Sequence, residues 1–83
     1  MTHQLVKVRW KDSVQSQPEW QYIEDLNELE PVEYISVGWV VQESSQSVSL
    51  MPNIGLSEPL QGSGLITIPM DAVIEIENLG ESK

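Results

Sequence analysis

Apolar and basic side chains alternate along the segment between Leu5 and Asp12. The apolar positions are Val6, Val8 and Trp10, and the basic positions are Lys7, Arg9 and Lys11. Successive side chains of a β-strand point to opposite faces, so each set projects from one face only. The segment therefore predicts a strand that turns its apolar face toward a core. Its three cations form a basic stripe, Lys7, Arg9 and Lys11, on the other face.

Four later segments also have the composition of strands, and they span residues 32–43, 47–50, 65–68 and 73–76. Short turns are predicted at 44–46 and 70–72. Residues 52–64 hold three Gly and two Pro, which predicts a long loop, and residues 78–83 are predicted to be a polar tail. Gly38 interrupts the longest strand, which indicates a bulge, a sharp bend or a close backbone approach at that position.

The stretch between the first two strands contains one candidate helix. Pro18 suits the first position of a helix, and Trp20, Ile23 and Leu26 recur at every third position. Pro31 ends the pattern because the residue before a proline disfavours helical backbone angles. A short helix or turn within 18–29 is therefore predicted, and an extended segment at 20–22 is the open alternative.

Five short strands, one insertion and a tight turn before the last strand predict an all-β fold. We expect a small SH3-like barrel, because Gly38 would let the long second strand bend sharply enough to serve both halves of it. An OB-like barrel is the alternative. The chain forms a single domain, 1–83, with flexible ends at 1–4 and 80–83. A chain of this size buries only about 60–65% of its unfolded surface, so we also expect a homo-oligomer.

The charge balance restricts the partners that the chain can have. Thirteen acidic residues stand against four basic ones, and the net charge is −9. This charge disfavours binding to a nucleic-acid backbone or to an anionic membrane surface. The chain has no Cys and one His, so we expect no metal site, no cofactor and a cytoplasmic location. No signal peptide and no membrane-spanning segment are predicted.

Catalytic motifs are missing from the sequence. It contains no P-loop and no nucleophile–base pair. Ser36 precedes Val37 and Gly38 but lacks the Gly two positions earlier that a nucleophile elbow requires. We therefore predict that the protein is not an enzyme and has no catalytic residues.

The candidate ligand site combines the basic stripe with two tryptophans. The stripe would neutralise an anionic ligand, and Trp20 and Trp39 would stack on a flat ring. Two structural alternatives stand beside this hypothesis. The cations could belong to a charged edge strand and pair with nearby Glu, and the tryptophans could fill a core that has no Phe. The acidic residues between Glu19 and Glu33 offer a second surface, which suits a host protein with a basic patch.

Two short motifs carry a resemblance. Ser36-Val37-Gly38-Trp39 and Ile68-Pro69, together with Trp10-Lys11-Asp12-Ser13, are similar to a group of small proteins encoded by tailed bacteriophages and prophages. The resemblance runs from Val6 to Leu79. It implies a phage or bacterial origin, a short β-barrel-like fold and no established activity. Members of this group often carry Lys or Arg after the Ile-Pro pair, whereas this chain has Met70.

Together these patterns predict a non-catalytic accessory protein that acts by binding inside a bacterial host cell. In the first hypothesis it sequesters a small anionic host molecule, such as a nucleotide signal, on the basic stripe. In the alternative it is a protein-interaction or assembly factor that uses its acidic surface.

Overall fold

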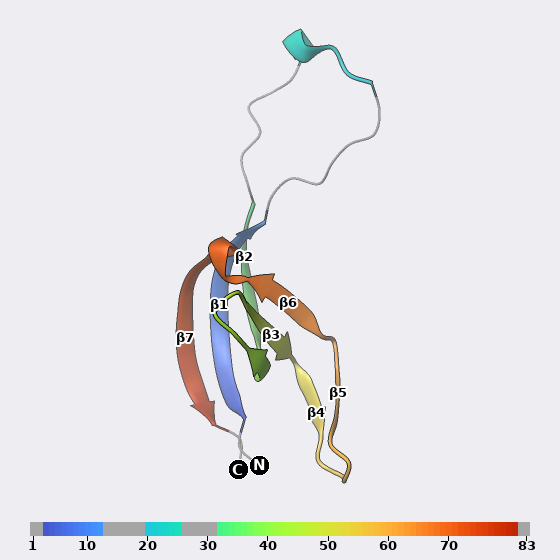
Figure 1. The fold of residues 1–83 in the computed structure, drawn as a ribbon, viewed down its shortest axis with the longest axis vertical. Coiled ribbons are helices and arrows are strands. Elements are labelled where there is room, and N and C mark those ends of the chain that lie inside the picture. Colours follow the sequence, from blue (N-terminus) through green and yellow to red (C-terminus); the bar gives the residue numbers. More distant parts are fainter. Residues whose placement is uncertain (1–2, 13–19, 26–31, 82–83) are drawn as a thin grey trace.

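A computed structural model describes residues 3–12, 20–25 and 32–81 of the chain. Within these residues the fold is all-β, as predicted, with a five-stranded sheet and a two-stranded one (Figure 1). The larger sheet contains β1 (Gln4–Asp12), β2 (Val32–Glu43), β3 (Ser47–Met51), β6 (Ile66–Pro69) and β7 (Val73–Glu81). The smaller sheet contains β4 (Asn53–Gly55) and β5 (Gln61–Ser63). Two single-turn 3-10 helices are present, η1 (Ile23–Asp25) and η2 (Met70–Ala72).

The order of strands in the larger sheet is β6-β3-β2-β1-β7, and every neighbouring pair is antiparallel. Four strands follow one another as a meander, and the last strand returns to pair with the first after the tight η2 turn. This is the order of an SH3-like barrel, here an open and strongly bent one, so the predicted fold class is confirmed. The tight turn predicted at 70–72 is η2 itself.

The core lies on the apolar face of β1. Among the described residues the buried hydrophobic side chains come from three strands, and they are Val6, Val8, Val48, Leu50 and Ile68. Trp10 packs against this cluster at its edge. The core face predicted for β1 is therefore confirmed. Burying each such side chain contributes about 1.5–3 kcal/mol, so a core this small stabilises the fold only modestly.

Gly38 lies at the point where β2 changes from pairing with β1 to pairing with β3. It lies opposite Val6 of β1, and the next residue, Trp39, lies opposite Met51 of β3. A Cβ atom at Gly38 would lie 3.1 Å from the Cβ of Leu50 and 3.2 Å from the carbonyl oxygen of Met51. The close backbone approach that the sequence indicates at this glycine is therefore confirmed.

Ser44 organises the turn between β2 and β3. Its hydroxyl oxygen accepts hydrogen bonds from the backbone N–H groups of Gln46 and Ser47, at 3.1 and 3.2 Å. The backbone N–H of Met70 then donates to the carbonyl oxygen of Gln46, at 2.8 Å. This bond fastens η2 to the β2–β3 turn and so fixes where β7 begins.

The structure predicted for two segments of the chain is wrong. The loop predicted at 52–64 contains the β4–β5 hairpin, in which Asn53 lies opposite Ser63. The polar tail predicted at 78–83 is strand as far as Glu81, because β7 pairs with β1 over its whole length. Gln4, Gly80 and Glu81, which were expected in flexible ends, all lie in these paired strands.

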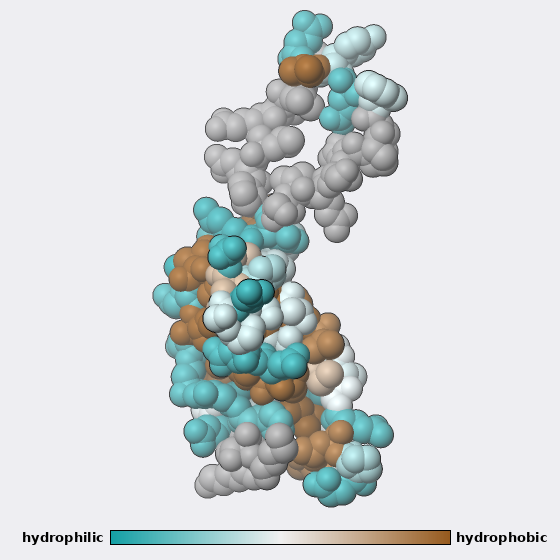
Figure 2. All heavy atoms as spheres, viewed as in Figure 1, coloured by the Kyte–Doolittle hydropathy of each residue, from teal (hydrophilic) through white to brown (hydrophobic). Residues whose placement is uncertain are grey.

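The molecule is elongated, with principal-axis extents of 55 × 23 × 19 Å. Residues 20–25, here called the distal segment, lie beyond the end of the β1–β2 ribbon and far from both chain ends (Figure 1). The helix or turn predicted within 18–29 is present as η1, while 18–19 and 26–29 lie outside the described residues. Figure 2 shows apolar surface over β7 and along the β4–β5 hairpin, interrupting the polar surface.

Candidate functional site

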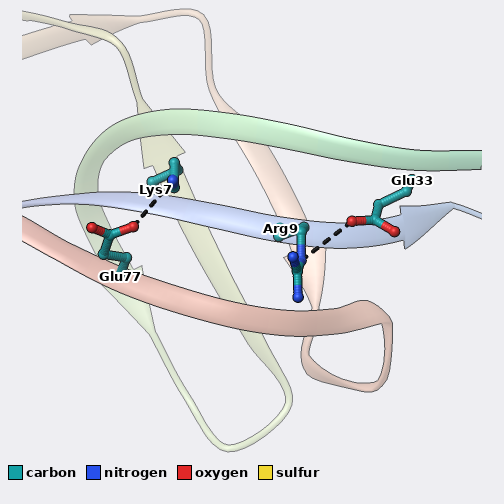
Figure 3. Close-up of polar contacts among 4 residues, drawn as sticks. All are labelled: Lys7, Arg9, Glu33 and Glu77. Atoms are coloured by element: carbon teal, nitrogen blue, oxygen red, sulfur yellow. Dashed lines mark ion pairs between the residues drawn. The ribbon is translucent and has the colours of Figure 1, made fainter.

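The basic stripe faces acidic side chains on both neighbouring strands. Lys7 lies opposite Glu77 of β7, Arg9 lies opposite Glu75, and Lys11 lies opposite Glu33 of β2. Two of these neighbours form ion pairs (Figure 3): the Nζ of Lys7 is 3.1 Å from the Oε2 of Glu77, and the Nε of Arg9 is 3.2 Å from the Oε1 of Glu33. The pairing of stripe cations with Glu, one of the alternatives drawn from the sequence, is therefore present.

The contact between Arg9 and Glu33 is ionic without a good hydrogen bond. The Nε atom of Arg9 is buried and has no hydrogen-bond acceptor, although the carboxylate is within ion-pair distance. The side chains of both residues remain almost half exposed. Exposed pairs of this kind contribute about 0–1 kcal/mol each, so the stripe is compensated by its neighbours but only weakly held.

β1 lies inside the sheet, between β2 and β7. The alternative in which the stripe belongs to an edge strand is therefore wrong. The three cations sit on an interior strand, flanked on both sides by carboxylates, so they do not create an isolated positive field. An anionic ligand on this face would have to displace Glu33 and Glu77 from their cations.

The three tryptophans have different surroundings. Trp39 lies opposite Leu5, so it shares the face of Lys7 and is partly buried. Trp10 faces the core side, where its ring lies 5.2 Å from that of Tyr34 and its Nε1–H donates to the Ser36 hydroxyl at 3.0 Å. Trp20 lies in the distal segment. The structure thus brings Trp39 to the face of Lys7, Arg9 and Lys11. The distal segment, which contains Trp20, lies apart from that face (Figure 1).

A hollow of about 410 Å³ lies where β1 ends beside η2 and the start of β7. The side chains that matter most to its chemistry are Trp10, Lys11, Asp12, Asp71 and Ile74. One cation and two carboxylates border an otherwise apolar wall. Asp71 and Ile74 were not predicted as site residues. The only sequence signal for them is the tight turn at 70–72, which places η2 directly before the strand that pairs with β1.

The distal segment exposes large apolar side chains to an unusual degree. Trp20 is 102% exposed, Tyr22 is 77% exposed and Ile23 is 85% exposed. Glu24, which is also exposed, adds negative charge to this segment. Aromatic residues in such positions are typical of the centres of protein–protein interfaces. Of the two tryptophans proposed from the sequence to stack on a ligand, Trp20 is fully exposed and Trp39 is partly buried.

Several other kinds of site find no support in the described part of the chain. No group of three or more His, Cys, Asp or Glu side chains there could hold a metal ion. None of its helices is long and apolar enough to cross a membrane. No protein-family model matches the chain, and neither a curated protein nor a solved structure does.

Proposed function

We propose that this protein is a non-catalytic accessory protein that binds a partner protein through its distal segment. The observation that carries the proposal is the exposure of Trp20, Tyr22 and Ile23 on six consecutive described residues. Monomeric proteins rarely present several large apolar side chains together without using them. A phage or prophage origin and action in the bacterial cytoplasm belong to the same proposal and rest on the resemblance of the sequence motifs.

The size of the exposed side chains fits a contact of this kind. Two fully buried aromatic side chains cover about 300–500 Å² together. A standard interface buries about 800 Å² on each partner, so Trp20 and Tyr22 alone would supply roughly half of it. Glu24 and the net charge of −9 favour a partner whose contact surface is basic.

The test is capture of a partner by the full-length protein from bacterial lysate. Trp20→Ala should abolish capture of the specific partner, because truncating a central interface Trp commonly costs 2 kcal/mol or more. Leu56→Ala is the matched control, since Leu56 is 78% exposed but lies at the β4–β5 hairpin. Equal capture by wild type and Trp20→Ala would refute the proposal.

The hollow beside Lys11 supports a second candidate function, the sequestration of a small anionic molecule such as a nucleotide signal. Lys11, which is exposed, and Trp10 are both among the residues that line it. Lys7 and Arg9 would add charge on the same strand once their carboxylate partners are displaced.

A thermal-shift screen with nucleotides and cyclic dinucleotides tests this second function. A ligand present at about 100 times its Kd adds about 2.7 kcal/mol to the free energy of unfolding. The melting temperature should then rise by about 10 °C or more, and Lys11→Glu should remove the shift. If no compound in the screen moves the melting temperature of the wild-type protein, sequestration is refuted.

A further inference from the structure

β2 has one long edge without a partner in the described structure. Its last residues, from Trp39 to Glu43, pair with β3, while residues 32–39 pair with β1 on the opposite side. Residues 32–38, here called the free edge, therefore have β1 on one side and no described strand on the other. Backbone N–H and C=O groups along such an edge are ready to pair with another strand.

The free edge lacks the features that normally block strand pairing. It contains no Pro, no Lys and one acid, Glu33, which is paired with Arg9. Its large side chains are exposed, including Ile35 at 61% and Val37 at 49%. The outer strand at the other side of the sheet differs: β7 carries Glu75, Glu77 and Glu81 and has two irregularities in its pairing with β1. Charges and bulges of that kind protect an edge.

The chain also exposes more surface to solvent than a compact monomer of the same mass would. Its accessible surface is 6762 Å². A compact monomer of 9.4 kDa would expose about 5,000 Å². The excess is about twice the 800 Å² that each partner buries in a standard interface. The exposed surface is therefore large enough to include the area that each protomer buries in a standard dimer interface.

We infer that two copies of this chain pair antiparallel through their free edges, about a two-fold axis, and join their sheets into one. A two-fold contact uses the same surface on both copies, so that surface must complement itself. The edge of a strand does so, because it presents both backbone N–H and C=O groups. The acidic protomers repel one another, and the one acid of the free edge, Glu33, is already paired with Arg9. The inference is independent of the partner proposed for the distal segment.

The length of the free edge fixes the register. Pairing along all of 32–38 places its central residue, Ile35, on the two-fold axis, opposite Ile35 of the second copy. Directly opposed residues of antiparallel strands have Cα atoms about 4.5–5.5 Å apart, which a disulfide can span. Val37 would face Glu33 instead. The two Val37 Cα atoms would then lie about 14 Å apart, well beyond disulfide reach.

Cysteine cross-linking reads out this register, because the chain has no Cys of its own. Under mild oxidation Ile35→Cys should form a covalent dimer. Val37→Cys should stay monomeric on a denaturing gel, as should Leu79→Cys, the control on β7, which is 45% exposed. Cross-linking at Val37 but not at Ile35, or equal cross-linking at all three positions, would overturn the inference.

Sedimentation of the full-length protein supplies a second readout. The wild type should be a dimer and Ile35→Lys a monomer, since a lysine at an exposed edge position opposes strand pairing without disturbing the core. The dimer should tighten as salt is raised, because salt screens the repulsion between two acidic protomers. A dimer that loosens with salt would point to contacts between the acidic distal segment and the basic stripe. That result, or a monomeric wild type, would refute pairing through the free edge.

Discussion

Gly38 is the residue at which the fold is most sensitive to one added carbon atom. In Gly38→Ala the new Cβ would lie 3.1 Å from the Cβ of Leu50 and 3.2 Å from both the carbonyl carbon and oxygen of Met51. These atoms are backbone or next to it, and Met51 is held opposite Trp39 by the β2–β3 pairing. No flexible side-chain end can move aside, so the two strands must separate.

Two effects of opposite sign set the size of the change. Overpacking a well-packed site costs about 1–3 kcal/mol. Replacing Gly by Ala also reduces the conformational entropy of the unfolded chain. This raises the free energy of unfolding by about 0.4–1 kcal/mol where the backbone angles suit alanine. The free energy of unfolding should therefore fall by about 1–2 kcal/mol. For a domain of this size, the melting temperature should drop by about 4–16 °C.

Urea denaturation followed by circular dichroism measures the change, with Gly55→Ala as the matched control. At Gly55 the nearest atom to an added Cβ is the carbonyl oxygen of Gln61, at 3.7 Å, which is ordinary contact, and its φ is not positive. Gly55→Ala should be neutral or slightly stabilising. If the two variants have the same midpoint of denaturation, the close approach at Gly38 does not constrain the fold and the reasoning is wrong.

Three further predictions concern the core and the polar contacts around it. Leu50→Ala should lower the free energy of unfolding by about 2–5 kcal/mol in urea denaturation, because Leu50 is 1% exposed in a small core. The hydroxyls of Ser49 and Thr67 share a hydrogen bond of 2.8 Å, and Ser49 is buried whereas Thr67 is exposed. Thr67→Val should therefore lower the free energy of unfolding by about 1–3 kcal/mol, which is more than Ser49→Ala does, because it leaves the buried Ser49 hydroxyl without a partner. Equal losses of stability for the two variants in thermal denaturation would contradict this. A double-mutant cycle on Lys7 and Glu77 should give a coupling of about 0.2–1 kcal/mol that shrinks as salt is added, and a coupling independent of salt would show that the pair is not a surface ion pair.

The strands could be predicted from the sequence where side chains alternate or are rich in β-branched residues. β2 spans the predicted residues 32–43, and β1 has the predicted core face. β5 could not be predicted, because Gln61-Gly62-Ser63 shows no alternation and is exposed throughout. The end of β7 is similar: Asn78 and Gly80 pair with β1 through backbone groups, which any residue type supplies.

The candidate site was predictable only as a set of residue types on strand faces. The alternation of β1 was enough to place Lys7, Arg9 and Lys11 on one face, and that placement is confirmed. The ion pair with Glu33 requires the pairing of β1 with β2, and the ion pair with Glu77 requires β7 to return to the first strand. The pairing of β1 with β7 joins residues about 70 positions apart in the sequence, so no local sequence pattern predicts it.

The lengths of the strands explain why so many side chains of the β1–β2 ribbon are exposed to solvent. β2 has 12 residues and β1 has 9, whereas β3 and β6, which supply the other side of the core, have 5 and 4. At about 3.4 Å per residue, β2 is roughly 40 Å long and β3 only about 17 Å. Beyond the reach of β3 and β6, the β1–β2 ribbon has few buried side chains, and Tyr34 and Val32 are exposed there although they lie on the core side. A two-stranded ribbon is marginally stable alone in water. Contacts made outside the chain, at the free edge or at the distal segment, would therefore stabilise the ribbon itself as well as the complex.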